Sequence, residues 1–160
     1  MNSIPWMVIA QDELGIAEVP GPKSNPQIMQ WFADLGIKDY TDDSIPWCAG
    51  YLSHLMQQCG AEQTLSYVPN KLWARDWLRV PEHCDPCYGA IMVFSRGSGG
   101  HVALYCSEDD DYYHIIGGNQ GDKVSIIRHS KANFLGARWP VEFTNLRVPG
   151  RVFNSKFSSD

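Results

Sequence analysis

The hydrophobic pattern of the chain changes near Pro81, and this change constrains the fold more than any other feature of the sequence. Before Pro81, apolar residues recur at steps of three and four, which is typical of amphipathic helices. After it, short β-rich runs alternate with clusters of Gly, Asp and Asn, which is typical of strands joined by turns. Helices followed by strands predict an α+β domain.

Four helices are expected in the first half of the chain. They cover residues 6–14, 26–35, 48–59 and 70–78. Asn25 and Pro26 give the second helix an N-cap followed by a proline at its first position, and Gly60 ends the third. The apolar residues of the third helix form one stripe that begins at Cys48.

Five short strands are expected after Pro81, paired as an antiparallel meander. They cover residues 90–94, 101–106, 112–116, 124–128 and about 135–139. A length of 160 residues suggests one domain. Residues 1–148 are therefore expected to form a single domain, and the polar residues 149–160 a frayed tail.

Charge and hydropathy argue against two classes of function. The net charge is −5 and the 13 Lys and Arg residues are scattered, whereas nucleic-acid binding needs a basic face. No apolar run reaches the roughly 18 residues that a membrane span needs. The first residues lack the basic and apolar regions of a secretory signal peptide. We therefore expect synthesis in the cytoplasm, and export, if any, by a route that reads no such signal.

The stretch IPWCAG, residues 45–50, raises the question whether Cys48 is reactive. A helix N-terminus lowers the pKa of a cysteine, because its free N–H groups and the helix dipole favour the thiolate. Pro46 disfavours helix upstream, and Trp47 is placed to wall off one side of a substrate pocket. The alternative is a buried core cysteine, which the apolar stripe supports. Both interpretations stay open on this stretch alone.

Thiolate chemistry also needs an imidazole base, and His101 is the best placed of the five histidines. It follows the SRGSGG loop, whose glycines let the backbone approach other groups closely, and it opens a strand. His54 is expected on the exposed face of its helix, and His129 at the surface. His114, in the middle of a strand, is expected to have a structural, hydrogen-bonded role. The alternative for His101 is a surface loop histidine.

A third polar group is expected at the end of the following strand, where the chain reads GGNQGD. Asn119 can accept a hydrogen bond from the far N–H of the imidazole and hold its tautomer. Gln120 is the alternative, because the strand register can shift by one or two residues. The segment can also be read as a simple hairpin turn.

Three motifs occur in the order WCA, GHVALY and GGNQ. In this order they resemble the papain-like peptidoglycan hydrolases of the NlpC and CHAP type (cysteine, histidine-dependent amidohydrolases/peptidases). The stretches PWMVIAQDELGIAEVPGPKSNPQI and LGARWP resemble the small single-domain members that phages and bacterial toxin systems carry. The likeness runs from about Pro5 to Pro140. It implies a papain-like α+β fold, with the nucleophile at a helix N-terminus packed on an antiparallel sheet.

The resemblance also implies roles for individual residues. Cys48 would be the nucleophile, His101 the base that becomes the acid, and Asn119 the orienting group. The backbone N–H of Cys48 would donate to the oxyanion. Tyr40 is the best upstream residue to complete the oxyanion hole. Some relatives use a carboxylate as the third residue, so the role of Asn119 is the least fixed.

The implied reaction is hydrolysis of an amide in the peptide stem of the bacterial cell wall, through a thioester. The resemblance leaves open whether the enzyme is an amidase or an endopeptidase. We expect no metal or cofactor, no nucleic-acid or membrane partner, and a monomer. The expected place of action is the periplasm or cell wall, after holin release or delivery by a secretion system. Delivery as a toxin would imply a cognate immunity protein.

Two further features allow other interpretations. The sequence HCDPC, residues 83–87, could be half a zinc site, but zinc usually takes two ligand pairs and no second pair has matching spacing. A redox role is disfavoured because no βαβ unit surrounds it. A disulfide between Cys84 and Cys87 is conceivable in an oxidising space, although a reduced loop is favoured. The six tryptophans suggest a non-catalytic carbohydrate-binding module in which Cys48 is a core residue.

Overall fold

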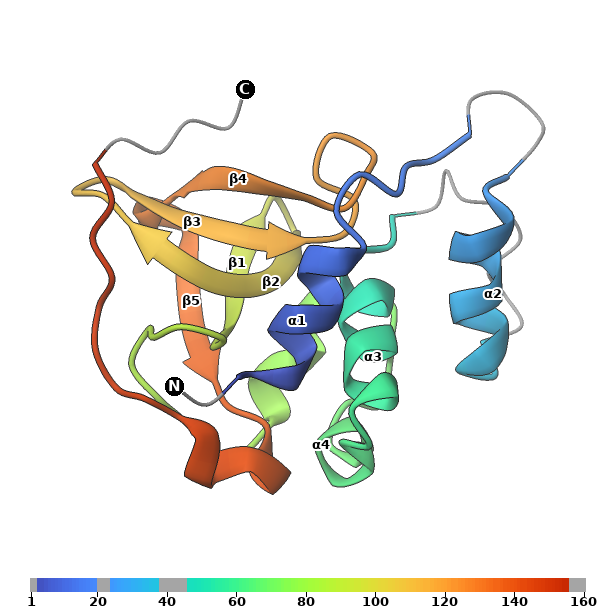
Figure 1. Cartoon of the computed structure of the whole chain (residues 1–160), viewed down its shortest axis with the longest axis horizontal. Helices are drawn as coiled ribbons and strands as arrows, with labels where there is room; N and C mark the ends of the chain where they lie inside the picture. The colour runs from blue at the N-terminus through green and yellow to red at the C-terminus, as the bar shows by residue number, and fades with distance from the viewer. Residues whose placement is uncertain (1–2, 20–23, 38–45, 156–160) are drawn as a thin grey trace.

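The α-helices of the computed structural model lie in the first half of the chain, as predicted (Figure 1). The structure describes residues 3–19, 24–37 and 46–155. The α-helices are α1 (Pro5–Asp12), α2 (Pro26–Asp34), α3 (Cys48–Gln58) and α4 (Glu62–Ser66). Three 3₁₀ helices are η1 (Ala74–Arg79), η2 (Lys131–Asn133) and η3 (Val141–Leu146).

Side-chain hydrogen bonds explain the start of α2 and the turn that precedes η1. The Asn25 side chain caps α2 by accepting a hydrogen bond from the N–H of Gln27 at 2.8 Å, as the sequence predicts. The helix predicted over residues 70–78 is wrong in extent and type. There the Asn70 side chain accepts from the N–H of Leu72 at 3.0 Å and closes a turn. Only a 3₁₀ helix follows, beginning at Ala74.

The strands form one antiparallel five-stranded sheet, which confirms the predicted α+β fold class. The strands are β1 (Ile91–Arg96), β2 (Gly99–Glu108), β3 (Tyr112–Gly117), β4 (Ser125–Ser130) and β5 (Phe134–Arg138). Their order is β4-β3-β2-β1-β5. The last strand therefore returns to the far edge beside β1, so the sheet departs from a simple meander.

The sheet curls strongly, as Figure 1 shows. The ring of Phe94 in β1 lies 4.1 Å from the ring of His129 in β4 and 6.0 Å from that of Phe134 in β5. Because β4 and β5 are the two edges of the sheet, one face closes around these rings. On β2, helix α3 packs with Leu52 and Leu55 near Val102.

Helix α3 is held by its two helical neighbours. A Cβ at Gly50 would lie 1.9 Å from Cε1 of Phe32, so only glycine lets α2 approach this closely. On α3, Nε2 of His54 donates to the Glu13 carboxylate at 3.0 Å, and its ring stacks on Trp31 with ring centroids 4.5 Å apart. The expectation that His54 is exposed is therefore wrong, because the loop after α1 and helix α2 cover that face of α3.

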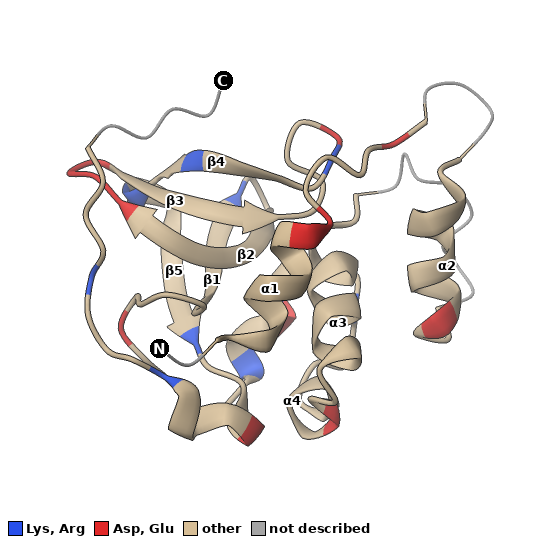
Figure 2. Cartoon of the chain, viewed as in Figure 1, with Lys and Arg blue, Asp and Glu red and all other residues tan. Residues whose placement is uncertain are grey.

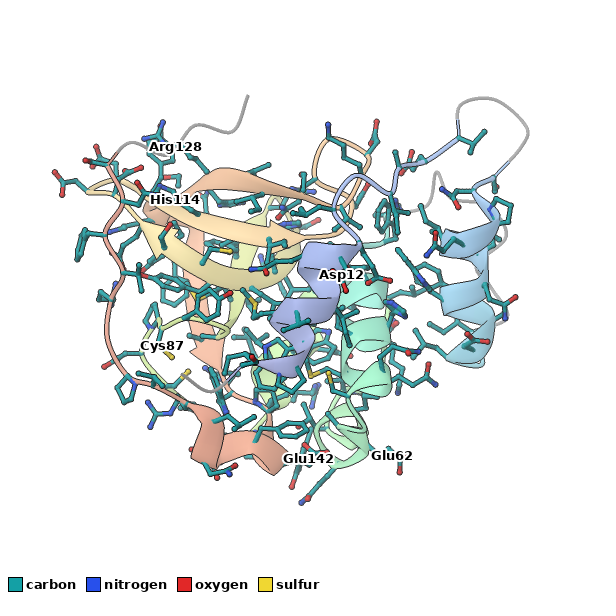
Figure 3. The ribbon with its side chains drawn as sticks, in the orientation of Figure 1. Asp12, Glu62, Cys87, His114, Arg128 and Glu142 are labelled. Carbon is teal, nitrogen blue, oxygen red and sulfur yellow. The ribbon has the colours of Figure 1, made fainter. Side chains whose placement is uncertain are left out.

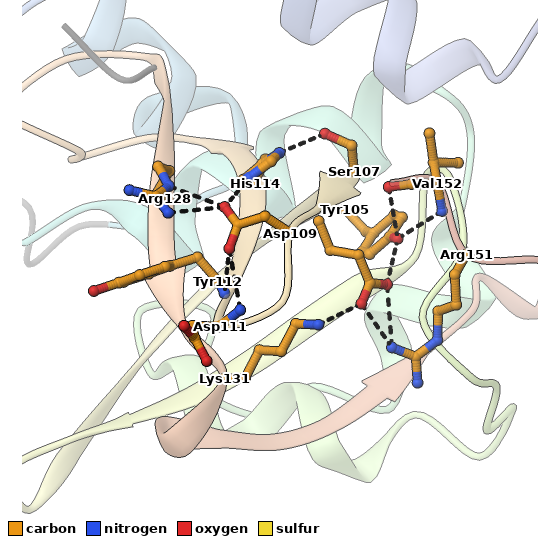
Figure 4. Close-up of polar contacts among 11 residues, drawn as sticks. Tyr105, Ser107, Asp109, Asp111, Tyr112, His114, Arg128, Lys131, Arg151 and Val152 are labelled. Atoms are coloured by element: carbon orange, nitrogen blue, oxygen red, sulfur yellow. Dashed lines mark hydrogen bonds and ion pairs between the residues drawn. The ribbon is translucent and has the colours of Figure 1, made fainter. Parts of the chain in front are cut away.

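The C-terminal segment up to residue 155 is paired with the sheet, so the expectation of a frayed tail is wrong for residues 149–155. The N–H of Glu108 donates to the carbonyl of Val152 at 2.7 Å, and the N–H of Asn154 donates back to Glu108 at 2.8 Å. The Glu108 side chain is 1 % exposed. Its carboxylate accepts hydrogen bonds from Tyr105, Lys131 and Arg151 (Figure 4). The segment thus supplies one of the cations that a buried carboxylate requires.

Candidate active site

Cys48 is the first residue of α3, and backbone N–H groups surround its sulfur. The preceding residue, Trp47, makes no side-chain cap to the first turn of the helix. The N–H groups of Val102, Ala49 and Cys48 itself all act as hydrogen-bond donors to the Cys48 sulfur. Val102 follows His101 in β2. The helix start therefore lies against the strand that carries the predicted base.

The electrostatics of Cys48 differ from the sequence-based expectation. Burial raises the pKa of its thiol above the ordinary value, and this effect exceeds the opposing effect of the backbone donors and of Arg96. The expectation of a thiolate stabilised by the helix N-terminus is thus corrected. Cys48 is 7 % exposed, and its thiol holds its proton near neutral pH. A nucleophilic role therefore requires a base that removes this proton during the reaction.

His101 is fully buried in β2, and its tautomer follows from the bonds of Gln120. The Gln120 amide N–H₂ donates to the carbonyls of Ile115 at 3.2 Å and Ser125 at 2.7 Å. Its Oε1 therefore faces His101 as an acceptor, 2.8 Å from Nε2. The hydrogen-bond network thus assigns the proton of the neutral imidazole to Nε2. The lone pair of the ring is then on Nδ1.

The Nδ1 atom of His101 is buried and has no hydrogen-bond partner in the part of the chain that the structure describes. Burial lowers the pKa of His101 to about 4, and the nearby charge of Arg96 acts in the same direction. The imidazole is therefore neutral at neutral pH, with its basic nitrogen unused. Arg96 lowers the pKa of Cys48 as well, which indicates that both groups lie in one electrostatic environment.

The partner of His101 is Gln120, so the expectation that Asn119 fills this place is corrected. Asn119 adopts a left-handed conformation, with φ of 55°, and this turn brings the next residue back toward His101. The two preceding glycines permit the close packing. A Cβ at Gly117 would lie 2.8 Å from the Cβ of Ala103, and one at Gly118 would lie 2.6 Å from the Cβ of Tyr51.

The family comparison agrees with this geometry. The family model of the CHAP domain matches residues 40–119, half of the 160-residue chain. The chain belongs to the CHAP domain family. The resemblance seen in the sequence is thereby confirmed, and so is the papain-like fold class. A search of curated proteins finds no match.

Membership makes this CHAP domain a hydrolase that acts on peptidoglycan. The matched region includes Cys48 and His101 and ends at Asn119, one residue before the observed partner of the imidazole. The one-residue difference between Asn119 and Gln120 could not be resolved from the motif alone, since it depends on the φ angle of the turn.

A second histidine, His129, lies beside the base of this CHAP domain, and the sequence analysis had placed it at the surface. Its ring is parallel to that of His101 within 3°, with centroids 5.7 Å apart. It is half-buried, and burial lowers its pKa. The signal that identifies its position is the pairing of β4 with β3, in which His129 lies opposite the buried Tyr113.

Two residues proposed for the substrate side have different outcomes. Trp47 is fully buried and donates from Nε1 to Glu18 at 2.8 Å. The expectation that its ring walls off an open pocket is therefore corrected: the ring is enclosed and packs closely against Gly118, where a Cβ would lie 2.7 Å from Cζ3 of Trp47. Tyr40, the candidate for the oxyanion hole, lies outside the described residues.

His114 has the structural role that the sequence predicts. Its ring nitrogens bond Ser107 at 2.7 Å and Asp109 at 2.8 Å, and Arg128 also bonds Asp109 at 2.9 Å (Figure 4). Figure 2 shows this acidic turn between β2 and β3 with basic residues close to it. The depression beside Asp109 is lined by neither Ser107 nor His114. Ser107, His114 and Asp109 therefore clamp the hairpin, and Ser107 and His114 lie outside the depression.

The described residues contain no group of three or more His, Cys, Asp or Glu side chains arranged to hold a metal ion. Within the same residues, no helix is long and apolar enough to cross a lipid bilayer.

Proposed function

We propose that this CHAP domain cleaves an amide bond in the peptide stem of peptidoglycan, with Cys48 as the nucleophile and His101 as the base. The observation that carries the proposal is the unused, buried Nδ1 of His101, next to the residue whose N–H contacts the Cys48 sulfur. A buried nitrogen base without a partner has lost its hydration. During the reaction, Nδ1 would accept the proton of the Cys48 thiol.

The proposed reaction begins from a neutral pair. The Cys48 sulfur attacks the amide carbonyl while its proton passes to Nδ1 of His101. The resulting imidazolium gives that proton to the leaving amine, which departs and leaves a thioester on Cys48. Water then attacks the thioester, its proton again goes to His101, and the carboxylic acid product leaves. Gln120 holds Nε2–H throughout and so keeps Nδ1 available for each transfer.

The backbone supplies the proposed oxyanion site. Trp47, the N-cap residue of α3, makes no side-chain cap, and the helix dipole favours negative charge at this end of the helix. A developing oxyanion next to Cys48 would accept hydrogen bonds from the backbone N–H groups of the first turn, which are fixed before the substrate arrives.

The alternative of a carbohydrate-binding module has less support. Five of the six tryptophans are buried in the core, and the other one, Trp73, is 51 % exposed. A stacking platform for sugars needs exposed aromatic rings. One exposed ring without an aromatic neighbour described beside it does not make such a platform.

The first prediction concerns Cys48→Ala. We expect this variant to lose hydrolysis of purified peptidoglycan by at least about a thousandfold, because the thioester cannot form. Mass spectrometry of the fragments gives the rate and identifies the bond, since an amidase releases free stem peptides and an endopeptidase leaves shortened stems on the sugars.

Cys59→Ala is the matched control, because Cys59 caps the other end of α3 and is only partly buried. It should digest peptidoglycan like the natural protein. Circular dichroism establishes that both variants are folded. Undiminished digestion by a folded Cys48→Ala variant would contradict the mechanism.

A further inference from the structure

The loop between η1 and β1 carries two cysteines, Cys84 and Cys87, for which the proposed hydrolysis has no use. Figure 3 labels Cys87 in this loop. Both cysteines are reduced in the structure. The loop that carries them pairs with β5, an edge strand of the sheet, through a bridge between His83 and Arg138. Their arrangement indicates a separate chemistry.

The two thiols are in contact. The Cys84 thiol donates a hydrogen bond to the Cys87 sulfur, and the Arg147 side chain is a second donor to Cys87. These two donors lower the pKa of Cys87, whereas the donated bond raises the pKa of Cys84. The pair therefore shares one negative charge more readily than an ordinary pair of thiols does.

Backbone hydrogen bonds hold the short segment that carries the two cysteines, which are three positions apart in the sequence. The N–H of Cys84 donates to the carbonyl of Ala137 in β5 at 3.4 Å, and the carbonyl of Cys87 accepts from the N–H of Ala90 at 2.9 Å. The Cys84 end of the segment is thus held by β5, and the Cys87 end by a turn that closes just before β1. The hydrogen bond between the two thiols keeps the sulfurs in contact, so forming a disulfide requires only a local adjustment.

The pair differs in access to solvent. Cys84 lines an open depression of about 610 Å³, whereas Cys87 is buried with 1 % exposure. The basic residues that line the depression are His83, Arg138, Arg147 and Arg151. Asp85 is an acidic residue on its wall. The depression therefore favours a small ligand with negative charge.

We propose that Cys84 and Cys87 are a redox-active dithiol, which a small anionic disulfide bound in this basic depression oxidises to an intramolecular disulfide. The surface thiol reacts first, the buried one completes the bond, and the arginines hold the carboxylates of the oxidant. This reaction is independent of the peptidoglycan chemistry at Cys48.

The exchange proceeds in two steps. The pair begins with one proton shared between the two sulfurs, because the other proton has gone to water. As the Cys84 sulfur attacks one sulfur of the external disulfide RSSR, the shared proton passes to Cys87, a mixed disulfide forms on Cys84, and RS⁻ leaves. Cys87 then gives this proton to the released RS⁻, and its thiolate, which Arg147 stabilises, attacks the Cys84 sulfur of the mixed disulfide. The intramolecular disulfide forms, and the second RS⁻ leaves and takes up the proton that the pair first released to water. In total the protein loses two hydrogens and RSSR becomes two RSH.

The test uses the full, folded chain and oxidised glutathione as the probe. Trypsin releases residues 80–96 as one peptide that contains Cys84 and Cys87 and no other cysteine. After treatment and alkylation with iodoacetamide, we expect this peptide to carry no alkyl group and to weigh two hydrogens less. Dithiothreitol treatment should restore two alkylated cysteines. A peptide that stays fully alkylated, or that carries only glutathione, would overturn the proposal.

Two cysteine variants test the order of the steps. Cys87→Ser should stop at the mixed disulfide, so glutathione stays attached to the 80–96 peptide. Cys84→Ser should gain little glutathione, because Cys87 is buried. Equal glutathione uptake by both variants would contradict the assigned order. If either variant fails to fold, the peptide map of the natural chain still decides whether the disulfide forms.

A charge variant tests the basic depression. We expect Arg147→Gln to slow oxidation by oxidised glutathione by about tenfold, because it removes the donor to Cys87. Arg79→Gln is the matched control with the same change in net charge, since Arg79 pairs with Asp76. Equal slowing by both variants would show that Arg147 has no specific role.

Discussion

Gln120 is the residue on which the proposed active site depends most, apart from the nucleophile and the base. It accepts the Nε2–H of His101, and two backbone carbonyls fix its own orientation. An imidazole held in this way presents Nδ1 without having to select a tautomer first.

We predict that Gln120→Ala lowers kcat/KM on peptidoglycan by roughly 100-fold, because the imidazole loses its fixed orientation. Asn119→Gly should keep most of the activity, since glycine adopts the φ of 55° found there without strain. Thermal unfolding of both variants separates loss of orientation from loss of the fold. Equal losses of activity for the two variants would place the orienting role elsewhere.

The sequence identifies the residues that form this site better than it predicts the directions of their pKa shifts. Cys48 and His101 stand out because motif and position agree. The direction of the Cys48 pKa shift was wrong, because it depends on how deeply the sheet buries the helix start, and no local pattern records that depth. The prediction that His129 lies at the surface was wrong for a related reason. Its ring packs against Phe94, which lies on β1, and β1 is not adjacent to β4 in the sheet. A local sequence pattern does not record such a contact.

Elements that long-range contacts stabilise were the hardest to predict. Helix α4 has five residues, too few to be stable alone. Its first N–H groups, at Gln63 and Thr64, are capped by the carboxylate of Glu142, which follows 78 residues after Thr64. The strands were predicted within one or two residues of their observed bounds, because their alternation and turns are local.

The C-terminal segment is a second element of this kind, and it gives a stability prediction. Removing residues 149–160 takes away Arg151 and the backbone partners of Glu108. We expect the free energy of unfolding to fall by about 2 kcal/mol, because the carboxylate stays buried with fewer donors. Urea denaturation measures the change.

A shorter truncation is the control for this prediction. Removing residues 156–160 keeps Arg151, Val152 and Asn154, and therefore keeps the partners of Glu108. If the two truncations have the same stability, the pairing of residues 149–155 contributes nothing measurable.

At the scale of the whole molecule, the buried His101 makes stability depend on pH. Its pKa is about 4 in the folded chain, against about 6.5 in an unfolded one. Between these values the unfolded chain binds a proton that the folded chain does not. The free energy of unfolding is therefore highest above pH 6.5 and falls as the pH drops toward 4.

We predict that this loss is of the order of 3 kcal/mol for the natural protein and smaller for His101→Gln, which cannot bind the proton. Urea denaturation at pH 7.5 and at pH 4.5 compares the two. The half-buried His129 acts in the same direction. The pKa of Asp109 is also lowered in the folded chain. Its contribution to the free energy of unfolding is lost only at pH values below the ordinary pKa of a carboxyl group. Equal pH dependence of the two proteins would mean that His101 is protonated in the folded state.

Each residue of the GGNQ segment, residues 117–120, is constrained by a different contact or backbone angle. Gly117 is fixed by the strand it touches, and Gly118 by the helix behind it. Asn119 suits the left-handed backbone, and Gln120 must donate and accept at once. Gly117, Gly118 and Gln120 therefore meet separate packing or hydrogen-bonding requirements, whereas position 119 also accepts glycine. These requirements come from the fold and not from the bond that is cut, so they would restrict the motif equally whichever stem bond the enzyme hydrolyses.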